Sequence, residues 1–410
     1  MDRRHFLKLL GYVGTSAIAT IGSHTWVART NAQTASPKRL IVIFLRGAVD
    51  GLNVVVPYGE TDYYQARPAI AIPQPNEDQG ALDLDGFFGL HPALSPLLPL
   101  WQQKNLAFIH SCGSTDATRS HFDAQYYMET GVPGDKKISE GWMNRLLGAL
   151  PGQTPVEAVS VGQSMPRALV GPESVANIAL GRHSARKLPI DREQVQTAFD
   201  QLYVNQDPVS LAYQEGRAAR EQLLKELEAE MDAASQGAPL PNGFAGEAQQ
   251  LASLMVRDSA IQVAFMDLGG WDTHVNQGGS KGQLANRLKP LGEGLAALVK
   301  RLGSVYSDTT IVVMSEFGRT VKENGNGGTD HGHGNALWLL GGNVRGGQVY
   351  GQWPGLSESE LYEGRDLAIT TDFRDVMSAI LTDQLRVKPK QVDRVFLGYR
   401  PSQQLDLFLA

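Results

Sequence analysis

The sequence predicts an α/β fold, specifically a three-layer α/β/α sandwich with a mostly parallel central sheet and a helical insertion. Two observations carry this prediction. Short apolar runs without polar interruption recur along the chain, and such runs are typical of strands that are buried on both faces. Between them lie longer segments whose apolar residues recur at helical spacing. Alternating strands and helices indicate a parallel sheet covered by helices.

Five apolar runs are the predicted strands of this sheet. The first is Arg39–Leu45, which ends at Arg46-Gly47. The other four lie at Leu106–His110, Ile261–Asp267, Thr309–Met314 and Ala336–Leu340. The predicted helices are Leu94–Gln103, His121–Glu129, Trp142–Leu150, Phe244–Val256, Gln283–Leu302 and Phe373–Leu381.

The segment from about 190 to 240 has a different composition. Asp191–Gln206 and Ser210–Ala234 are charged and alanine-rich, with Glu and Lys at helix-face spacing. We predict an inserted helical hairpin or cap beside the sheet, ended by the turn-rich residues 237–243. A pair of solvated surface helices without a partner would explain the same pattern.

The chain begins with a pattern typical of a twin-arginine export signal. Arg3 and Arg4 precede Phe6-Leu7-Lys8, and a weakly apolar stretch runs from Leu9 to about Ile21. Small residues that suit a cleavage site follow at Ala28, Ala32 and Ala35. We therefore expect residues 1–35 to be a signal peptide. An amphipathic helix that stays on the protein is the alternative.

Such a signal implies a location and a partner. Residues 36–410 are expected to form one α/β domain in the periplasm, or outside a bacterial cell, after passage through the twin-arginine translocase. No later segment approaches the roughly 20 apolar residues that span a bilayer, so the mature form is not expected to cross a membrane. Because this route carries folded proteins, it suits a chain that loads a metal before export.

Charge and cysteine content exclude several classes of function. Arg3, Arg4, Lys8 and Arg29 against Asp2 give residues 1–32 a net charge of +3, which leaves about −9 for the remainder of a chain whose total is −6. An acidic body argues against nucleic-acid binding. Cys112 is the only cysteine, so neither an internal disulfide nor a thiolate metal cluster can form.

Polar residues collect after the predicted strands, where open α/β sheets bind their ligands. Asp50 lies in a glycine-rich loop directly after the first strand. It suits a metal or an active site, although an aspartate that caps its own turn would look the same. After the third strand, Asp272 and His274 are two residues apart, so in an extended segment both can ligate one cation.

The residues after the second strand combine hydroxyls with a histidine. Thr118, Arg119 and Ser120 precede His121 at the start of a predicted helix. Ser120 and Asp123 fit an N-terminal capping box, which is a sufficient structural reason for both. The positive end of the helix dipole would also favour a phosphate or sulfate ester there, with His121 as acid, base or ligand.

Two further clusters lie later in the chain. Glu316 and Arg319 follow the fourth strand and either bind an anionic substrate or pair with each other. Asp330, His331 and His333 then lie within four residues among glycines. Carboxylate and imidazole ligands without thiolate suit zinc, manganese, iron or magnesium-type ions. An exposed polar glycine loop without metal is the alternative for this last cluster.

Five strings in this order resemble the Domain of Unknown Function 1501 family, whose members often carry twin-arginine signals. They are Phe44–Asn53, Arg119–Gln125, Gly270–His274, Ser315–Thr320 and Thr329–Gly334. That family is similar to the alkaline phosphatase-like superfamily of phosphatases, sulfatases and cofactor-independent phosphoglycerate mutases. The resemblance implies a metal-dependent hydrolase with an α/β fold and a hydroxyl nucleophile. Ser120 or Thr118 is the candidate for that nucleophile.

The resemblance further implies two divalent metal ions, which can be zinc, manganese, iron, magnesium or calcium. One ion would be held by Asp50, Asp330 and His331, and the other by Asp272, His274 and His333. Two-metal hydrolysis of a small phosphate or sulfate ester is the implied chemistry, with Arg119 or Arg319 holding the anionic group. The alternative is an exported metal-binding protein that acts in binding or assembly without catalysis.

Overall fold

The structure is a computed structural model that describes residues 16–21, 24–29, 37–151, 157–162, 164–178 and 232–409. The chain forms two compact units, Met1–Pro37 and Lys38–Ala410. In the first unit, β1 (Ser16–Ile21) pairs antiparallel with β2 (His24–Arg29). Most of the predicted signal peptide and of the predicted insertion at 190–240 lies outside the described residues.

The second unit is built on a nine-stranded sheet. Five strands confirm the predicted ones: β3 (Arg39–Leu45), β7 (Leu106–Gly113), β10 (Ile261–Leu268), β11 (Thr309–Ser315) and β12 (Asn335–Gly341). The other four are β8 (Glu157–Val161), β9 (Val175–Ile178), β13 (Val349–Tyr350) and β14 (Thr371–Asp372). Their order is β13-β7-β12-β11-β3-β10-β8-β9, with β14 also on β7.

One strand of this sheet runs against the others. β12 is antiparallel to both neighbours, β7 and β11, whereas the remaining pairs in the sheet are parallel. Asn335 at the start of β12 lies opposite Cys112 near the end of β7. The beginning of β12 therefore lies at the edge where the parallel strands end, and the residues before it reach that edge.

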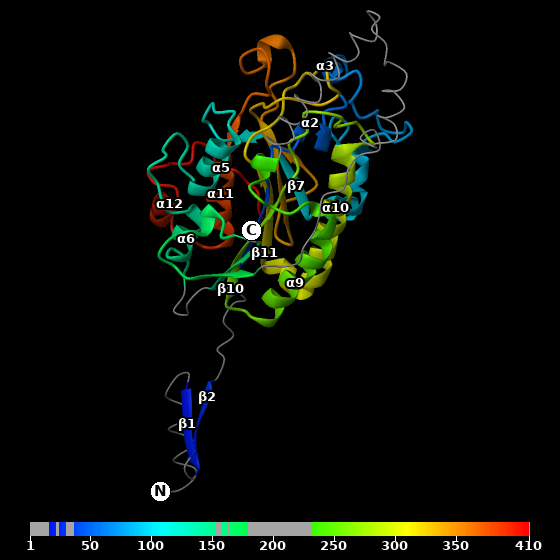
Figure 1. The fold of residues 1–410 in the computed structure, drawn as a ribbon. Helices are drawn as coiled ribbons and strands as arrows, with labels where there is room; N and C mark the ends of the chain where they lie inside the picture. The colour runs from blue at the N-terminus through cyan, green and yellow to red at the C-terminus, as the bar shows by residue number, and fades with distance from the viewer. Residues whose placement is uncertain are drawn as a thin grey trace, which may run out of the picture. The chain divides into compact units, whose positions relative to one another are not determined.

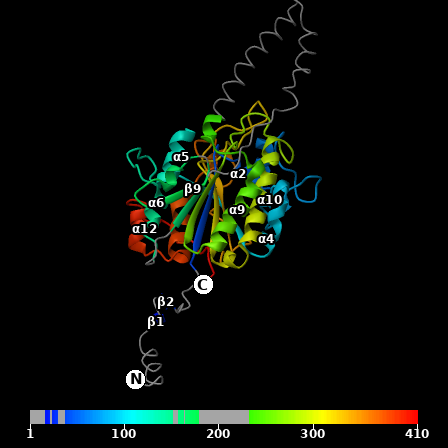
Figure 2. The ribbon, with the colours of Figure 1, turned by 60° about the horizontal axis from the view of Figure 1, so that its bottom comes forward.

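Each face of the sheet packs on its own layer of helices, as Figures 1 and 2 show. Along β3, Ile41 and Ile43 belong to one apolar core and Val42 and Phe44 to the other, because successive side chains point to opposite faces. One layer holds the 3₁₀ turn at Pro92–Leu97, α4 (Leu98–Gln102), α9 (Phe244–Arg257) and α10 (Gln283–Leu302). The other holds α5 (His121–Thr130), α6 (Trp142–Leu147), α11 (Phe373–Ala379) and α12 (Pro389–Val395). The predicted three-layer α/β architecture is confirmed.

Smaller elements complete the unit. A three-stranded sheet has the order β4-β6-β5, and short helices flank it. These elements are α2 (Gly51–Val54), α3 (Thr61–Ala66), β4 (Val55–Val56), β5 (Leu82–Asp83) and β6 (Gly89–Leu90). Further single turns lie at Arg167–Leu169, Pro241–Gly243, Gly303–Asp308 and Glu358–Glu360. Among the described residues, no helix is both long and apolar enough to cross a membrane.

Three predicted helices differ in detail from the structure, and the simplest case is the predicted helix Trp142–Leu150, which ends at Leu147. The predicted helix Leu94–Gln103 is divided into a 3₁₀ turn and α4, with Pro96 inside the turn. Proline lacks the N–H that an α-helix interior needs, so the regular helix begins only after it. The predicted helix Phe373–Leu381 ends its α-helical part at Ala379 and continues as a π-helical turn, Ile380–Gln384.

Candidate metal centre

Three histidines and an aspartate meet at the edge of the sheet where the parallel strands end. His121 opens α5 after β7, Asp272 and His274 follow β10, and His331 precedes the reversed strand β12. An isolated antiparallel bridge between Arg319 and His331 holds the last segment against the one that follows β11. We call His121, Asp272, His274 and His331 the histidine–aspartate cluster.

The imidazoles of this cluster point their Nε2 atoms toward one another. His331 Nε2 lies 2.9 Å from His121 Nε2 and 2.9 Å from His274 Nε2. The Asp272 carboxylate lies beside all three, with Oδ1 3.0 Å from His274 Nε2 and 3.4 Å from His331 Nε2. Its other oxygen, Oδ2, lies 3.5 Å from His121 Nε2.

Each Nδ1 atom of the cluster faces a fixed oxygen on the outside. His121 Nδ1 lies 2.7 Å from Glu316 Oε1, and His331 Nδ1 lies 2.9 Å from the carbonyl of Arg119. His274 Nδ1 lies 3.1 Å from Asp330 Oδ1. A carbonyl only accepts, so His331 must donate from Nδ1, which leaves its Nε2 as a bare lone pair. Metal-binding histidines in proteins are oriented by outer acceptors of this kind.

The two oxygens of Asp272 have different surroundings. Oδ1 accepts a hydrogen bond of 2.5 Å from Arg319 Nη1, and both side chains are fully buried. Oδ2 is buried and has no hydrogen-bond partner. A buried carboxylate oxygen without a donor is costly, and a cation beside it would remove that cost. The orphaned oxygen lies on the side of Asp272 that faces His121.

The cluster shifts the acid–base properties of its members. Burial alone would lower the pKa of His121, but Asp272 and Glu316 outweigh it and raise the pKa to about 9. Burial would raise the pKa of Asp272, yet the three imidazoles beside it and the charge of Arg319 hold it well below its usual range. Burial lowers the pKa of His331. The surroundings therefore favour the anionic form of Asp272 and the neutral form of His331.

His274, like His121, has a carboxylate near each of its ring nitrogens. Burial opposes its protonation, but hydrogen bonds to Asp272 and Asp330 raise its pKa. The same hydrogen bond to His274 lowers the pKa of Asp330 to about 2. His274 is thus held between Asp272 and Asp330, beside the three residues whose ligand atoms lie closest together.

The donor set fits a metal ion. His121, Asp272 and His331 each offer one ligand atom, and these atoms lie within 4.8 Å of one another. Two imidazole nitrogens and a carboxylate oxygen suit zinc or another first-row divalent ion. Three protein ligands leave a further coordination position open, as catalytic rather than structural zinc sites do.

A buried chain of polar side chains supports His121 from behind. Gln125 Nε2 donates to Glu316 Oε1 over 2.8 Å, and Arg46 Nη1 donates to Gln125 Oε1 over 2.8 Å. Arg46 is itself held by ion pairs with Glu129 and Asp267. The supporting roles of these residues went unnoticed in the sequence. A carboxylate directly after a buried strand, as Glu316 is, was the available signal.

Asp50 and His333 make their contacts elsewhere. Asp50 Oδ2 accepts hydrogen bonds of 2.6 Å from both Arg67 and Gln277. His333 is buried and stacks on Tyr362 with ring centroids 4.3 Å apart. Of the six predicted metal ligands, the structure brings Asp272, His274 and His331 together, with Asp330 on the outer side of His274.

The hydroxyls proposed as nucleophiles flank the cluster. Ser120 is exposed at the N-cap of α5, and its side chain makes no capping hydrogen bond, so the predicted capping box is wrong. Asp123 instead forms an ion pair of 2.7 Å with Lys136, and its carboxylate is therefore engaged away from the N-terminus of α5. Thr118 Oγ1 accepts a hydrogen bond of 3.2 Å from the Ser120 N–H.

The two candidate anion-binding arginines are both engaged. Arg119 pairs with Glu363 and Asp366, each at 2.7 Å, and its side chain is about one-third exposed. Arg319 is buried against Asp272 and Thr329. The predicted alternative, a pair between Glu316 and Arg319, is wrong because Glu316 turns to His121 and Gln125 instead.

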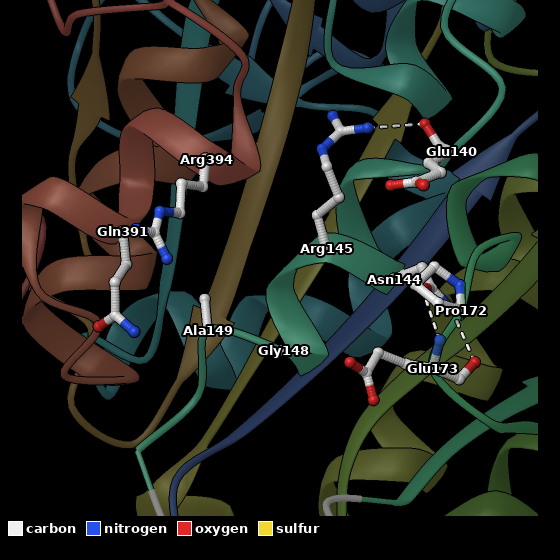
Figure 3. A pocket seen from close by; sticks show the side chains of 9 residues that line it. All are labelled: Glu140, Asn144, Arg145, Gly148, Ala149, Pro172, Glu173, Gln391 and Arg394. Atoms are coloured by element: carbon white, nitrogen blue, oxygen red, sulfur yellow. Dashed lines mark hydrogen bonds between the residues drawn. The ribbon is translucent and has the colours of Figure 1, made fainter.

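A separate cavity of about 210 Å³ lies among α6, the Pro172-Glu173 loop and α12, as Figure 3 shows. None of the cluster residues lines it. Asn144 Nδ2 donates to the carbonyl of Glu173 over 2.9 Å, and Arg145 Nη1 donates to that of Glu140 over 2.7 Å. These side chains hold neighbouring backbone segments together, so we assign this cavity to packing.

Solved structures resemble this chain at low similarity. The C-terminal periplasmic domain of EcEptC from Escherichia coli, in complex with Zn, is 13% identical over 74% of this chain and 73% of that one, with a TM-score of 0.35. Ps i-CgsB in complex with k-i-k-neocarrahexaose is 11% identical over 86% and 72%, with a TM-score of 0.39. The lipoteichoic acid synthase LtaP from Listeria monocytogenes is 10% identical over 90% and 74%, with a TM-score of 0.37.

No curated protein sequence matches the chain. A family model described as a protein of unknown function (DUF1501) matches residues 132–396. That range covers more than half of the chain and includes Asp272, His274 and His331. The expected family membership is thereby confirmed: the chain belongs to the DUF1501 family.

Proposed function

We propose that this chain is an exported, metal-dependent hydrolase of phosphate or sulfate esters, whose ion is held by His121, Asp272 and His331. The observation that carries the proposal is the convergence of Nε2 atoms on a buried carboxylate that has one orphaned oxygen. A contact of 2.9 Å between two imidazole nitrogens needs a proton or a metal ion between them, and an ion bound by both rings would take the place of the shared proton.

A divalent ion in this position would polarise an ester oxygen as a Lewis acid and lower the pKa of a bound water. The chain's own residues prepare the place. Glu316 orients His121, and Arg319 holds Asp272 Oδ1 so that Oδ2 stays free. Because these supports are buried, the ligand atoms are held in place before an ion or substrate arrives.

The choice of an anionic ester rests on charge and on the family resemblance. A divalent ion would add positive charge beside Asp272, whose own charge Arg319 already offsets. A negatively charged substrate is favoured next to such a centre.

The nucleophile of the proposed reaction is a hydroxyl of the segment that leads into α5. Ser120 precedes the ligand His121, and its hydroxyl is not used as a helix cap. Thr118 is the second candidate, since it lies next to Arg119, whose carbonyl orients His331. Arg119 would meet the anionic group if it left Glu363, its exposed partner.

Export by the twin-arginine translocase belongs to the same proposal. Its support is the order of Arg3-Arg4, weakly apolar stretch and small residues. Passage in the folded state would allow the ion to be bound in the cytoplasm, before the protein is exported.

A purified mature protein tests the proposal. Bound metal is measured by mass spectrometry, and turnover is measured on aryl phosphates and aryl sulfates. We expect bound metal and turnover of at least one ester class, lost in Ser120→Ala or Thr118→Val but kept in Ser304→Ala. Ser304 is a matched control because it lies before β11, at the opposite edge of the sheet. Protein that binds no divalent ion would refute the proposal.

One observation favours a non-catalytic metal protein as the second candidate. His121, Asp272 and His274 are buried, and His331 exposes only 14% of its side chain, so the centre has a narrow opening to solvent. Restricted access of solvent would suit an ion that stabilises the fold better than one that must meet a substrate. Tightly bound metal without turnover of any ester, together with a large loss of stability on chelation, would support this candidate.

A further inference from the structure

We propose that this centre holds one metal ion, and that the guanidinium of Arg67 takes the place at Asp50 where the family resemblance implies a second ion. The inference rests on the proposed function for the first ion. The inference concerns which cation neutralises the Asp50 carboxylate, and the contacts of Arg67 show that it is the guanidinium of Arg67.

Asp50 and Arg67 form a fully buried ion pair. Arg67 Nη1 lies 2.6 Å from Asp50 Oδ2, and neither side chain is exposed to solvent. The pair is local, since 17 residues separate the two positions and α3 lies between them. Arginine does not lose its proton in proteins, so this positive charge is permanent.

Each of the three guanidinium nitrogens of Arg67 donates at least one hydrogen bond. Nε donates to the carbonyl of Val321 over 2.8 Å, and Nη2 donates to that of Thr320 over 2.8 Å. Nη1 makes a second hydrogen bond of 2.7 Å to Asn53 Oδ1. A guanidinium held by four acceptors cannot swing aside to admit a metal ion without leaving a buried charge unpaired.

The oxygen atoms around Asp50 are occupied by donors. Asn53 Oδ1 accepts from Tyr63 Oη as well as from Arg67. Gln277 Oε1 accepts from the hydroxyls of Thr273 and Thr329. Asp50 Oδ1 is the exception, being buried without a partner. One oxygen is too few for a divalent ion, which takes four or more ligands in protein sites.

The partners expected for Asp50 on a second ion point elsewhere. The Asp330 side chain is 54% exposed and its Oδ1 contacts His274 Nδ1 and Asn324 Nδ2. Asp50 is fully buried. His331 directs Nε2 to the histidine–aspartate cluster and Nδ1 to the Arg119 carbonyl, which leaves it no nitrogen for another ion.

The two arginine–aspartate pairs are joined through Gln277. Its amide nitrogen donates to Asp50 Oδ2, and its oxygen accepts from Thr329, whose Oγ1 lies 3.2 Å from Arg319 Nε. Arg319 in turn holds Asp272. Arg67 therefore anchors a buried hydrogen-bond network that ends on Asp272, a ligand of the proposed ion. Its guanidinium is a permanent cation of this network and is not replaced by a metal ion.

Metal stoichiometry tests this inference. Metal-depleted mature protein is titrated with Zn²⁺ and with Mn²⁺, and bound ion is counted by calorimetry and mass spectrometry. We expect one equivalent per chain and an uncoupled six-line Mn²⁺ spectrum in electron paramagnetic resonance. Two equivalents with a spin-coupled spectrum would overturn the inference and leave the proposed function intact. No binding would overturn both.

Two variants locate the ion relative to Asp50. Asp50→Asn keeps an oxygen for Arg67, and we expect it to retain one equivalent with a Kd within about threefold of the wild type, whereas Asp272→Asn should lose it. If Asp50→Asn fails to fold, the double variant Asp50→Asn/Arg67→Met removes both charges together and is held to the same count. Loss of an equivalent in either Asp50 variant, with the fold intact by circular dichroism, would overturn the inference.

Discussion

The Nε2 atoms of His121 and His331 lie 2.9 Å apart, although 210 residues separate the two histidines along the chain. Their other ring nitrogens are held by Glu316 and by the Arg119 carbonyl. Because both outer positions are occupied, the two rings cannot turn away from each other without losing a buried hydrogen bond. This contact is the centre of the proposed site; three predictions concern its surroundings, and a fourth concerns two other buried histidines.

Asp272→Asn should abolish tight metal binding. The substitution removes the anionic ligand and leaves the buried guanidinium of Arg319 without its counter-charge. We expect Zn²⁺ affinity to fall by more than a hundredfold, beyond the roughly 10–100-fold typical of outer partners. The metal-free protein should also lose about 3 kcal/mol in free energy of unfolding. Calorimetry and urea denaturation measure the two effects, with Asp123→Asn, an exposed ion pair, as the control.

Glu316→Gln should weaken metal binding through His121. Glutamine keeps an acceptor for His121 Nδ1 but removes the negative charge that makes the imidazole a stronger ligand. We expect Zn²⁺ affinity to fall about 10–100-fold with little change in fold. Glu363→Gln is the matched control, because that carboxylate is 55% exposed and pairs only with Arg119 among its charged contacts in the described residues. Equal effects of the two substitutions would contradict the role of Glu316.

Gly47→Ala should disturb Asp272 from the opposite side of the loop. Gly47 has a φ of +112°, and a Cβ there would lie 2.6 Å from the backbone nitrogen of Asp272. We expect a loss of about 1–3 kcal/mol in stability together with weaker Zn²⁺ binding. Gly86→Ala is the control, because it introduces the same backbone strain without a steric clash: its φ is +88° and no atom lies within 4 Å of its Cβ position. Undiminished Zn²⁺ affinity in Gly47→Ala would show that this loop does not position Asp272.

Stability should fall as the pH falls from about 6.5 toward 4, through His91 and His110. Burial lowers the pKa of each histidine to about 4, whereas an unfolded chain protonates histidine near 6.5. The unfolded state therefore binds more protons in this window, and each histidine lowers the free energy of unfolding by about 1.4 kcal/mol per pH unit.

Urea denaturation at several pH values measures this slope. His91→Asn is a suitable variant because His91 Nδ1 accepts the N–H of Ala93 at a helix start, where asparagine can cap equally well. In this variant the free energy of unfolding should depend on pH less steeply than in the wild type, by the contribution of one histidine, about 1.4 kcal/mol per pH unit. An identical slope would mean that His91 is protonated in the folded protein.

The sequence was sufficient for the fold class and for most of the elements at the site. Residues 40–45 are all apolar and all buried, and only a strand covered on both faces makes use of that pattern. α10 begins and ends at the predicted residues, since its apolar stripe has a clear helical period. Asp272, His274 and His331 were marked by their residue types alone.

Tertiary structure decided the rest, because contacts between distant segments depend on strand direction and packing. The reversal of β12 brings His331 to the edge where β7 leads into His121. Which ring nitrogen faces inward depends on Glu316, a residue 195 positions from His121. Asp50 suited a metal by its place after β3, yet its charge is met by Arg67. Local spacing determines which face a side chain takes, whereas only the folded chain determines which charge lies opposite it.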